Sequence, residues 1–107
     1  MLAPMQREIV ILTSIEHISL NNDAAMDLLA HIRRDSGEHR EEAEQPLLTA
    51  INQGGRAEVR WSDNGKAAAL RAIHAWLDSE GAPDIPRSVM DLRYELMRNL
   101  KLPPFDD

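Results

Sequence analysis

The spacing of apolar residues constrains this chain more than any other feature, because most of it follows the period of an α-helix. The clearest segment runs from Asn64 to about Ser79, and its apolar face consists of Ala69, Leu70, Ile73, Trp76 and Leu77. Ser62 and Asp63 stand just before it and are typical helix N-cap residues. We therefore predict a helix here, and its further alanines permit close approach of a neighbouring element: Ala67, Ala68, Ala72 and Ala75.

Three further segments have helical spacing and recognisable ends. The first begins at a cap among residues 21–23, stops at residues 35–37, and carries Ala25, Leu28, Leu29 and Ile32. The second begins at Pro46, which would break a helix running through residues 38–45, and ends at residues 54–55. The last begins near residues 86–88 and ends at the prolines 103–104; its expected buried positions are Val89, Leu92, Leu96 and Leu100.

Residues 4–19 carry conflicting signals. Their β-branched composition favours a strand, whereas Ile11, Ile15 and Ile18 recur at i, i+4 and i+7, the spacing of a helix face. We predict a helix over 4–19 and keep a strand as the alternative. Residues 56–61 alternate charged and apolar side chains, which predicts a short strand. Because one strand needs a partner, it pairs either with residues 8–12 or with a second copy of the chain.

The length of 107 residues is that of one domain. We predict a mainly α fold, a small bundle of four to five short helices. A minor β element, residues 56–61, is the expected addition, with pairing to residues 8–12 as one of its two alternatives. The single domain spans residues 1–107, with residues 101–107 as a C-terminal tail.

The composition bounds the location and the chemistry of the protein. The chain has no cysteine, which removes disulfides, thiolate zinc ligands and cysteine nucleophiles. No signal peptide is recognisable at the start, and the best apolar run, residues 9–12, is far too short to span a membrane. We expect a cytoplasmic protein without membrane association, of a size and style typical of bacteria.

The charge is unevenly distributed. The chain has 12 Lys and Arg against 18 Asp and Glu, a net charge of −6, which repels nucleic acid in general. Residues 35–53 hold five acids and one arginine, a net charge of −4. An acidic surface attracts an oppositely charged protein, and the residues predicted to dock such a partner are Glu38, Glu41, Glu42 and Glu44.

The two tryptophans, Trp61 and Trp76, allow two interpretations. Tryptophan is enriched at the centres of protein interfaces, so both are candidate partner-binding residues. The alternative, favoured by the usual burial of tryptophan, places both in the core. An unpaired strand and an alanine-rich helix surface also favour self-association, most simply as a two-fold homodimer.

No sequence motif indicates catalysis. Gly-x-Ser-x-Gly and Gly-x-Gly-x-x-Gly are absent, and residues 64–67 lack the upstream glycine and the hydroxyl residue of a phosphate-binding loop. One metal-site pattern remains, because i, i+3, i+4 and i+7 spacing on a continuous helix would place carboxylates and an imidazole on one face. Its residues are Asp35, Glu38, His39 and Glu42, and Gly37 inside the span argues against a continuous helix.

The leading hypothesis is therefore a non-catalytic protein, without a cofactor, that binds another protein or itself, as a small inhibitor or an antitoxin does. A metal-assisted enzyme is one alternative. The other is a transcriptional regulator whose last helix binds DNA through Arg87, Arg93, Arg98 and Lys101. Two features weigh against DNA binding: the long connector before that helix, residues 79–85, and arginines that do not share one face.

Overall fold

A computed structural model describes residues 8–79 and 84–101. Within them the chain forms a small sheet and four helices. The elements in chain order are β1 Glu8–Leu12, β2 Ile18–Asn21, α1 Asn22–Arg34, α2 Arg40–Gln53, β3 Arg56–Arg60, α3 Asp63–Asp78 and α4 Arg87–Asn99. The prediction of a mainly α fold with a minor β element is confirmed, although the sheet has three strands and the helices do not form a bundle alone. The predicted tail lies outside the described residues from residue 102 onward.

The sheet has the strand order β2-β1-β3. β1 and β2 form an antiparallel hairpin, and β1 and β3 are parallel, in register from Glu8 opposite Arg56 to Leu12 opposite Arg60. Residues 56–60 therefore pair with residues 8–12 of the same chain, the first of the two predicted partners. The helix predicted over residues 4–19 is wrong from residue 8 onward, and residues 4–7 lie outside the described residues.

The spacing of three isoleucines has a different cause from the one predicted. Ile11 and Ile18 face each other across the β1–β2 hairpin, and Ile15 lies in the turn between the strands. Ile11 is fully buried, whereas Ile15 is 51% exposed. A helix face would have buried both, so the interval of seven residues reflects a hairpin register. The strand is favoured because neighbours on both sides satisfy the backbone of β1.

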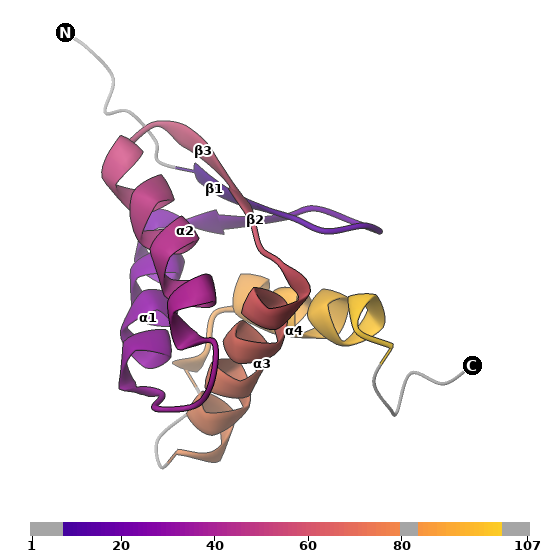
Figure 1. The fold of residues 1–107 in the computed structure, drawn as a ribbon. Helices are drawn as coiled ribbons and strands as arrows, with labels where there is room; N and C mark the ends of the chain where they lie inside the picture. The colour runs from indigo at the N-terminus through magenta and orange to yellow at the C-terminus, as the bar shows by residue number, and fades with distance from the viewer. Residues whose placement is uncertain (1–7, 80–83, 102–107) are drawn as a thin grey trace, which may run out of the picture.

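All four helices that the structure describes lie on one side of the sheet (Figure 1). The sheet residues in the hydrophobic core belong to the face turned toward them: Ile9, Ile11, Leu20, Ala57 and Val59. Because side chains alternate along a strand, Glu8, Val10 and Glu58 belong to the opposite face. There the Glu8 carboxylate accepts hydrogen bonds from Ser19 Oγ and from Arg56 Nε, and thus links the three strands.

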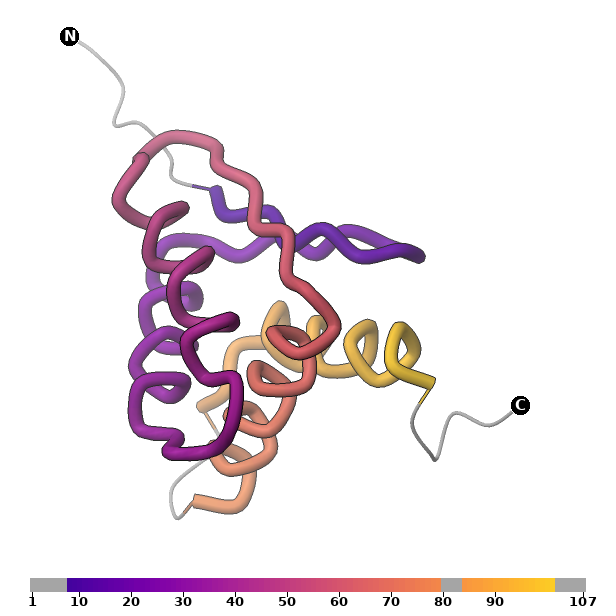
Figure 2. The backbone as a smooth tube through the Cα atoms, in the orientation of Figure 1, coloured from indigo at the N-terminus to yellow at the C-terminus, as the bar shows by residue number. Residues whose placement is uncertain are grey.

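Helices α1, α3 and α4 form where their apolar spacing predicts them. The side chain of Asn21 accepts the Ala24 N–H at 2.8 Å and caps α1; Ser62 accepts the Gly65 N–H at 3.1 Å and caps α3. The predicted buried face of α1 is confirmed, and so is that of α4 except at its end, where Leu100 is partly buried. The chain path in Figure 2 shows the β1–β2 hairpin running out over α4.

Helix α2 differs from its prediction, because it begins at Arg40 and runs through Pro46. Proline has no N–H for the carbonyl four residues earlier, which is that of Glu42. The next carbonyl, that of Ala43, accepts the indole Nε1–H of Trp61 at 2.9 Å. The Trp61 indole, from the segment following β3, therefore bonds the backbone of α2 next to the point that the proline interrupts. The helix ends as predicted, at two glycines with positive φ, Gly54 at 73° and Gly55 at 61°.

No helix within residues 8–79 and 84–101 is long and apolar enough to cross a membrane.

Candidate functional site

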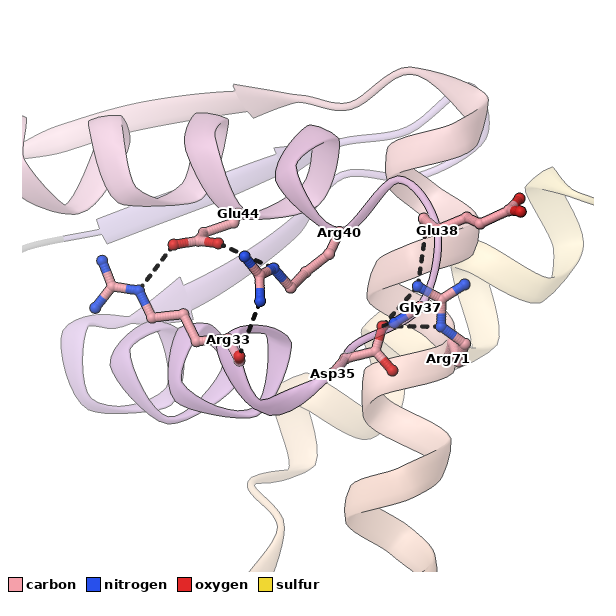
Figure 3. A network of polar contacts seen from close by, with 7 residues as sticks. All are labelled: Arg33, Asp35, Gly37, Glu38, Arg40, Glu44 and Arg71. Carbon is pink, nitrogen blue, oxygen red and sulfur yellow. Dashed lines mark hydrogen bonds and ion pairs between the residues drawn. The ribbon is translucent and has the colours of Figure 1, made fainter.

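The connection between α1 and α2, residues 35–39, is fixed to α3 by one arginine (Figure 3). Arg71 of α3 donates from Nε and Nη2 to Oδ2 of Asp35, at 2.9 and 2.6 Å. Its Nη2 also donates to the backbone carbonyl of Glu38 at 2.8 Å. Asp35 Oδ2 in turn accepts the N–H of Gly37 at 3.3 Å. One side chain thus sets the conformation of the whole connection, which we call the clamped loop.

Asp35 keeps its negative charge in this arrangement. The hydrogen bond from Arg71 lowers the pKa of Asp35 and outweighs partial burial, which raises it. The positive charges of Arg71 and Arg40 and the Gly37 N–H also lower that pKa. The Asp35 side chain is only 14% exposed, so water and salt screen this ion pair less than they screen a pair on the open surface.

Gly37 is the point at which Arg71 passes closest to the clamped loop. A Cβ on Gly37 would lie 2.4 Å from Cζ of Arg71, far inside van der Waals contact. A side chain at this position would therefore require the Arg71 guanidinium, the end of a flexible side chain, to shift. The sequence indicates only a helix stop here; the structure adds a close approach of Arg71.

A second set of ion pairs joins α1 to the first half of α2. The Glu44 carboxylate, 12% exposed, lies 3.0 Å from Arg33 Nε and 3.5 Å from Arg40 Nε. Arg40 also donates to the Arg33 carbonyl at 3.4 Å. Glu44, predicted as a docking residue, is therefore largely engaged within the chain.

The remaining predicted docking residues, Glu38, Glu41 and Glu42, are exposed on the clamped loop and the first turn of α2. Within the described residues, neither Glu38 nor Glu41 has an ion pair, and Figure 3 shows the Glu38 side chain directed away from Arg71. Glu42 accepts from Ser62 Oγ at 2.9 Å and lies 2.6 Å from His39 Nδ1. The hydrogen bond from Ser62, followed by that from His39, lowers the pKa of Glu42.

A surface hollow of about 530 Å³ lies beside Glu41 and Glu42. Its walls are Ser36, Gly37, His39, Arg40, Glu41 and Glu42. His39 has a φ of 64°, in the left-handed region that non-glycine residues rarely adopt. Such conformations persist where the surrounding structure over-determines them, and here the clamp on one side and α2 on the other do so.

The alternative metal site is not assembled. The predicted continuous helix does not exist, because α1 ends at Arg34 and α2 begins at Arg40. Asp35 is engaged by Arg71, while His39 and Glu42 pair with each other away from it. Within the part of the chain that the structure describes, no three histidine, aspartate or glutamate side chains are placed to hold a metal ion.

Both tryptophans lie in the core, as the second interpretation proposed. Trp61 is 4% exposed and donates to the Ala43 carbonyl; Trp76 is 8% exposed and stacks on the His31 ring, with centroids 4.1 Å apart. Burial lowers the pKa of His31, and Arg34 adds to the effect. The tryptophans therefore offer little surface to a partner in this conformation.

The basic residues proposed for DNA binding do not form one surface. Arg98 pairs with the buried Glu95 at 3.0 Å and lies over the Tyr94 ring. Arg93 is partly buried, and its charge adds to the burial that lowers the pKa of His74. Arg87 and Lys101 are exposed at opposite ends of α4. The last helix thus lacks an exposed row of cations.

The residue that organises the candidate site, Arg71, is absent from the sequence-based predictions. It is an exposed charge on an alanine-rich helix, and nothing in the local pattern distinguishes it from an ordinary solvated arginine. Comparison with family models, with curated proteins and with solved structures found no match to this chain. The function is therefore argued from the chain's own residues.

Proposed function

We propose that this protein acts by non-catalytic binding of a basic partner protein. The proposed contact surface consists of the outer acids Glu38 on the clamped loop and Glu41 and Glu42 on the first turn of α2. The observation that carries the proposal is the clamp of Arg71 on Asp35 and the Glu38 carbonyl. A loop ordered before binding loses little conformational entropy when a partner docks. The absence of cysteine is compatible with a reducing compartment such as the cytoplasm.

The distribution of charge around the loop supports this role. The acids that lie against other elements, Asp35 and Glu44, are neutralised by arginines of the same chain. The acids that face solvent, Glu38 and Glu41, have no such partner among the described residues. Internal pairing therefore leaves the surplus negative charge on the exposed rim, where it is accessible to another molecule.

The hollow beside these acids suggests the chemistry of the contact. It is bordered by the carboxylates of Glu41 and Glu42, and Arg40 is the one arginine among its wall residues. A lysine or arginine side chain of a partner would find carboxylates at the rim and the net charge of −6 attracting it over a longer range. A second copy of this chain fits less well at these acids, because a two-fold axis passing through them would place like charges against each other.

The test is capture from a native lysate by the immobilised full-length chain, with quantitative mass spectrometry of the bound proteins. The double variant Glu38→Gln/Glu41→Gln, here called the loop variant, removes one charge from the clamped loop and one from the first turn of α2. The matched control, Glu16→Gln/Glu58→Gln, removes two charges from exposed positions on the β1–β2 turn and on β3. We expect a basic protein that wild type and control retain at low salt, and whose retention the loop variant reduces on the order of tenfold.

Two outcomes contradict the proposal. One is equal loss of the captured protein in both double variants, which would show that net charge alone governs binding. The other is a captured set that neither variant changes. A circular-dichroism spectrum identical to that of wild type is the check that each variant has folded.

A further inference from the structure

A second cavity, of about 320 Å³, lies where the parallel strands β1 and β3 end. The β1–β2 turn closes one side of it and the first turn of α3 another. Three of its wall residues are basic: His17 from the turn, Arg60 from the end of β3, and Lys66 from α3. No aspartate or glutamate is among its wall residues, in a chain with 18 of them.

Lys66 is the most enclosed of these basic residues, with a side chain 13% exposed. Its ammonium group donates to Oδ1 of Asn99 at 3.1 Å. The carboxylate paired with it, that of Asp63, is 3.9 Å away and 89% exposed. An ammonium group has three donors, so Lys66 holds a mostly buried charge with a neutral oxygen as its one close acceptor.

The other two basic side chains, those of Arg60 and His17, also have donors to spare. The Arg60 side chain makes no ion pair or hydrogen bond within the described residues, although a guanidinium carries five N–H donors. His17 accepts the N–H of Thr13 on Nδ1 at 3.2 Å, which leaves the Nε2–H of the neutral ring as a donor. The cavity therefore gathers donors and positive charge without matching acceptors.

The walls of this cavity are held in place before any ligand arrives. Asn99 of α4 accepts on Oδ1 from the Ser14 N–H at 3.0 Å, from Ser14 Oγ at 2.9 Å, and from Lys66. Thr13 Oγ1 accepts the backbone N–H groups of residues 15 and 16, which fixes the turn itself. Turn, α3 and α4 thus meet at a single amide oxygen.

We propose that this cavity binds the phosphate group of a small organic phosphate, with Arg60, Lys66 and His17 as its donors. Arginine forms paired hydrogen bonds to phosphate oxygens, and lysine binds them as a point charge. The volume is at the lower end of small-molecule sites, so an organic body fits beside the phosphate. The apolar wall residue Leu12, which is only partly buried, is placed to contact that body. The inference is independent of the proposed partner surface.

The test is titration of the full-length protein with phenyl phosphate, inorganic phosphate and phenol, followed by amide chemical shifts in NMR spectra. Arg60→Gln removes one donor group. Arg56→Gln is the matched control. It removes the same charge from the same strand at an exposed position, where Arg56 pairs with Glu8. We expect phenyl phosphate to shift the amide resonances of residues 13–17 and 60–66 in wild type and control. We expect Arg60→Gln to weaken the affinity of the protein for phenyl phosphate at least about tenfold.

Phenol alone is expected to leave these resonances unchanged, and Lys66→Gln to weaken binding as Arg60→Gln does. Equal weakening by Arg56→Gln and Arg60→Gln would overturn the proposal, because it would reduce the effect to net charge. Shifts absent from residues 13–17 and 60–66 would also overturn it. Inorganic phosphate binding as tightly as phenyl phosphate would overturn the assignment of an organic ligand and restrict the site to the free ion.

Discussion

Replacing Ile11 with alanine is expected to lower the free energy of unfolding by about 2–5 kcal/mol. Ile11 is fully buried on β1, the central strand, between Ile18 on β2 and Val59 on β3. The variant loses the transfer free energy of the removed methyl and methylene groups and leaves a cavity against the helices. Urea denaturation at neutral pH measures the change as a shift in midpoint at constant slope.

Ile15→Ala is the control for this measurement, because it makes the same chemical change. Ile15 is 51% exposed in the β1–β2 turn, and we expect its replacement to alter stability by no more than about 0.5 kcal/mol. The two replacements would lower stability equally if Ile11 and Ile15 both lay on the buried face of one helix. Equal losses at the two positions would therefore contradict the hairpin.

The second large effect is expected for Gly65→Ala, and its sign is the informative part. Within a helix, alanine is normally more stable than glycine by about 1 kcal/mol. Here a Cβ would lie 2.8 Å from the Glu42 carbonyl oxygen and 3.3 Å from Cβ of Trp61. Because the first contact is with backbone, α3 would have to move away from α2, and we expect a net destabilisation of about 1–3 kcal/mol.

Asn64→Ala serves as the comparison, since Asn64 is exposed in the same turn of α3. We expect it to change stability by no more than about 0.5 kcal/mol. Thermal unfolding of the two variants beside wild type gives the sign directly. A melting temperature of Gly65→Ala above that of wild type would show that α3 and α2 are not in contact at this point.

The helices could be predicted from the sequence because local signals agree with their tertiary environment. In α1 and α3 the caps Asn21 and Ser62 and the buried stripes indicate the same boundaries. In β1 the local signals conflicted with each other. Ile11 and Ile18 are seven residues apart, an interval that fits a helix face as well as this hairpin. The need of residues 56–61 for a partner strand left two alternatives, and the structure shows the first of them, pairing with residues 8–12.

The candidate sites were harder to predict, because their residues come together only in the folded chain. The acidic character of residues 38–44 is visible in the sequence. Which of those acids stay unpaired depends on Arg33, Arg40 and Arg71, whose positions the fold determines. The basic cavity joins a turn, a strand end and two helices, so no window of sequence contains it.

The parallel pairing of β1 with β3 positions both candidate sites. The basic cavity forms at the ends of these strands, and β3 leads into α3, which carries Arg71. Backbone NOEs in solution test that pairing directly. We predict cross-strand NOEs between Ile9 and Ala57 and between Ile11 and Val59, with strand-type NOEs along residues 8–12. Helical NOEs running through residues 8–19, with none to residues 56–60, would contradict the fold and both sites built on it.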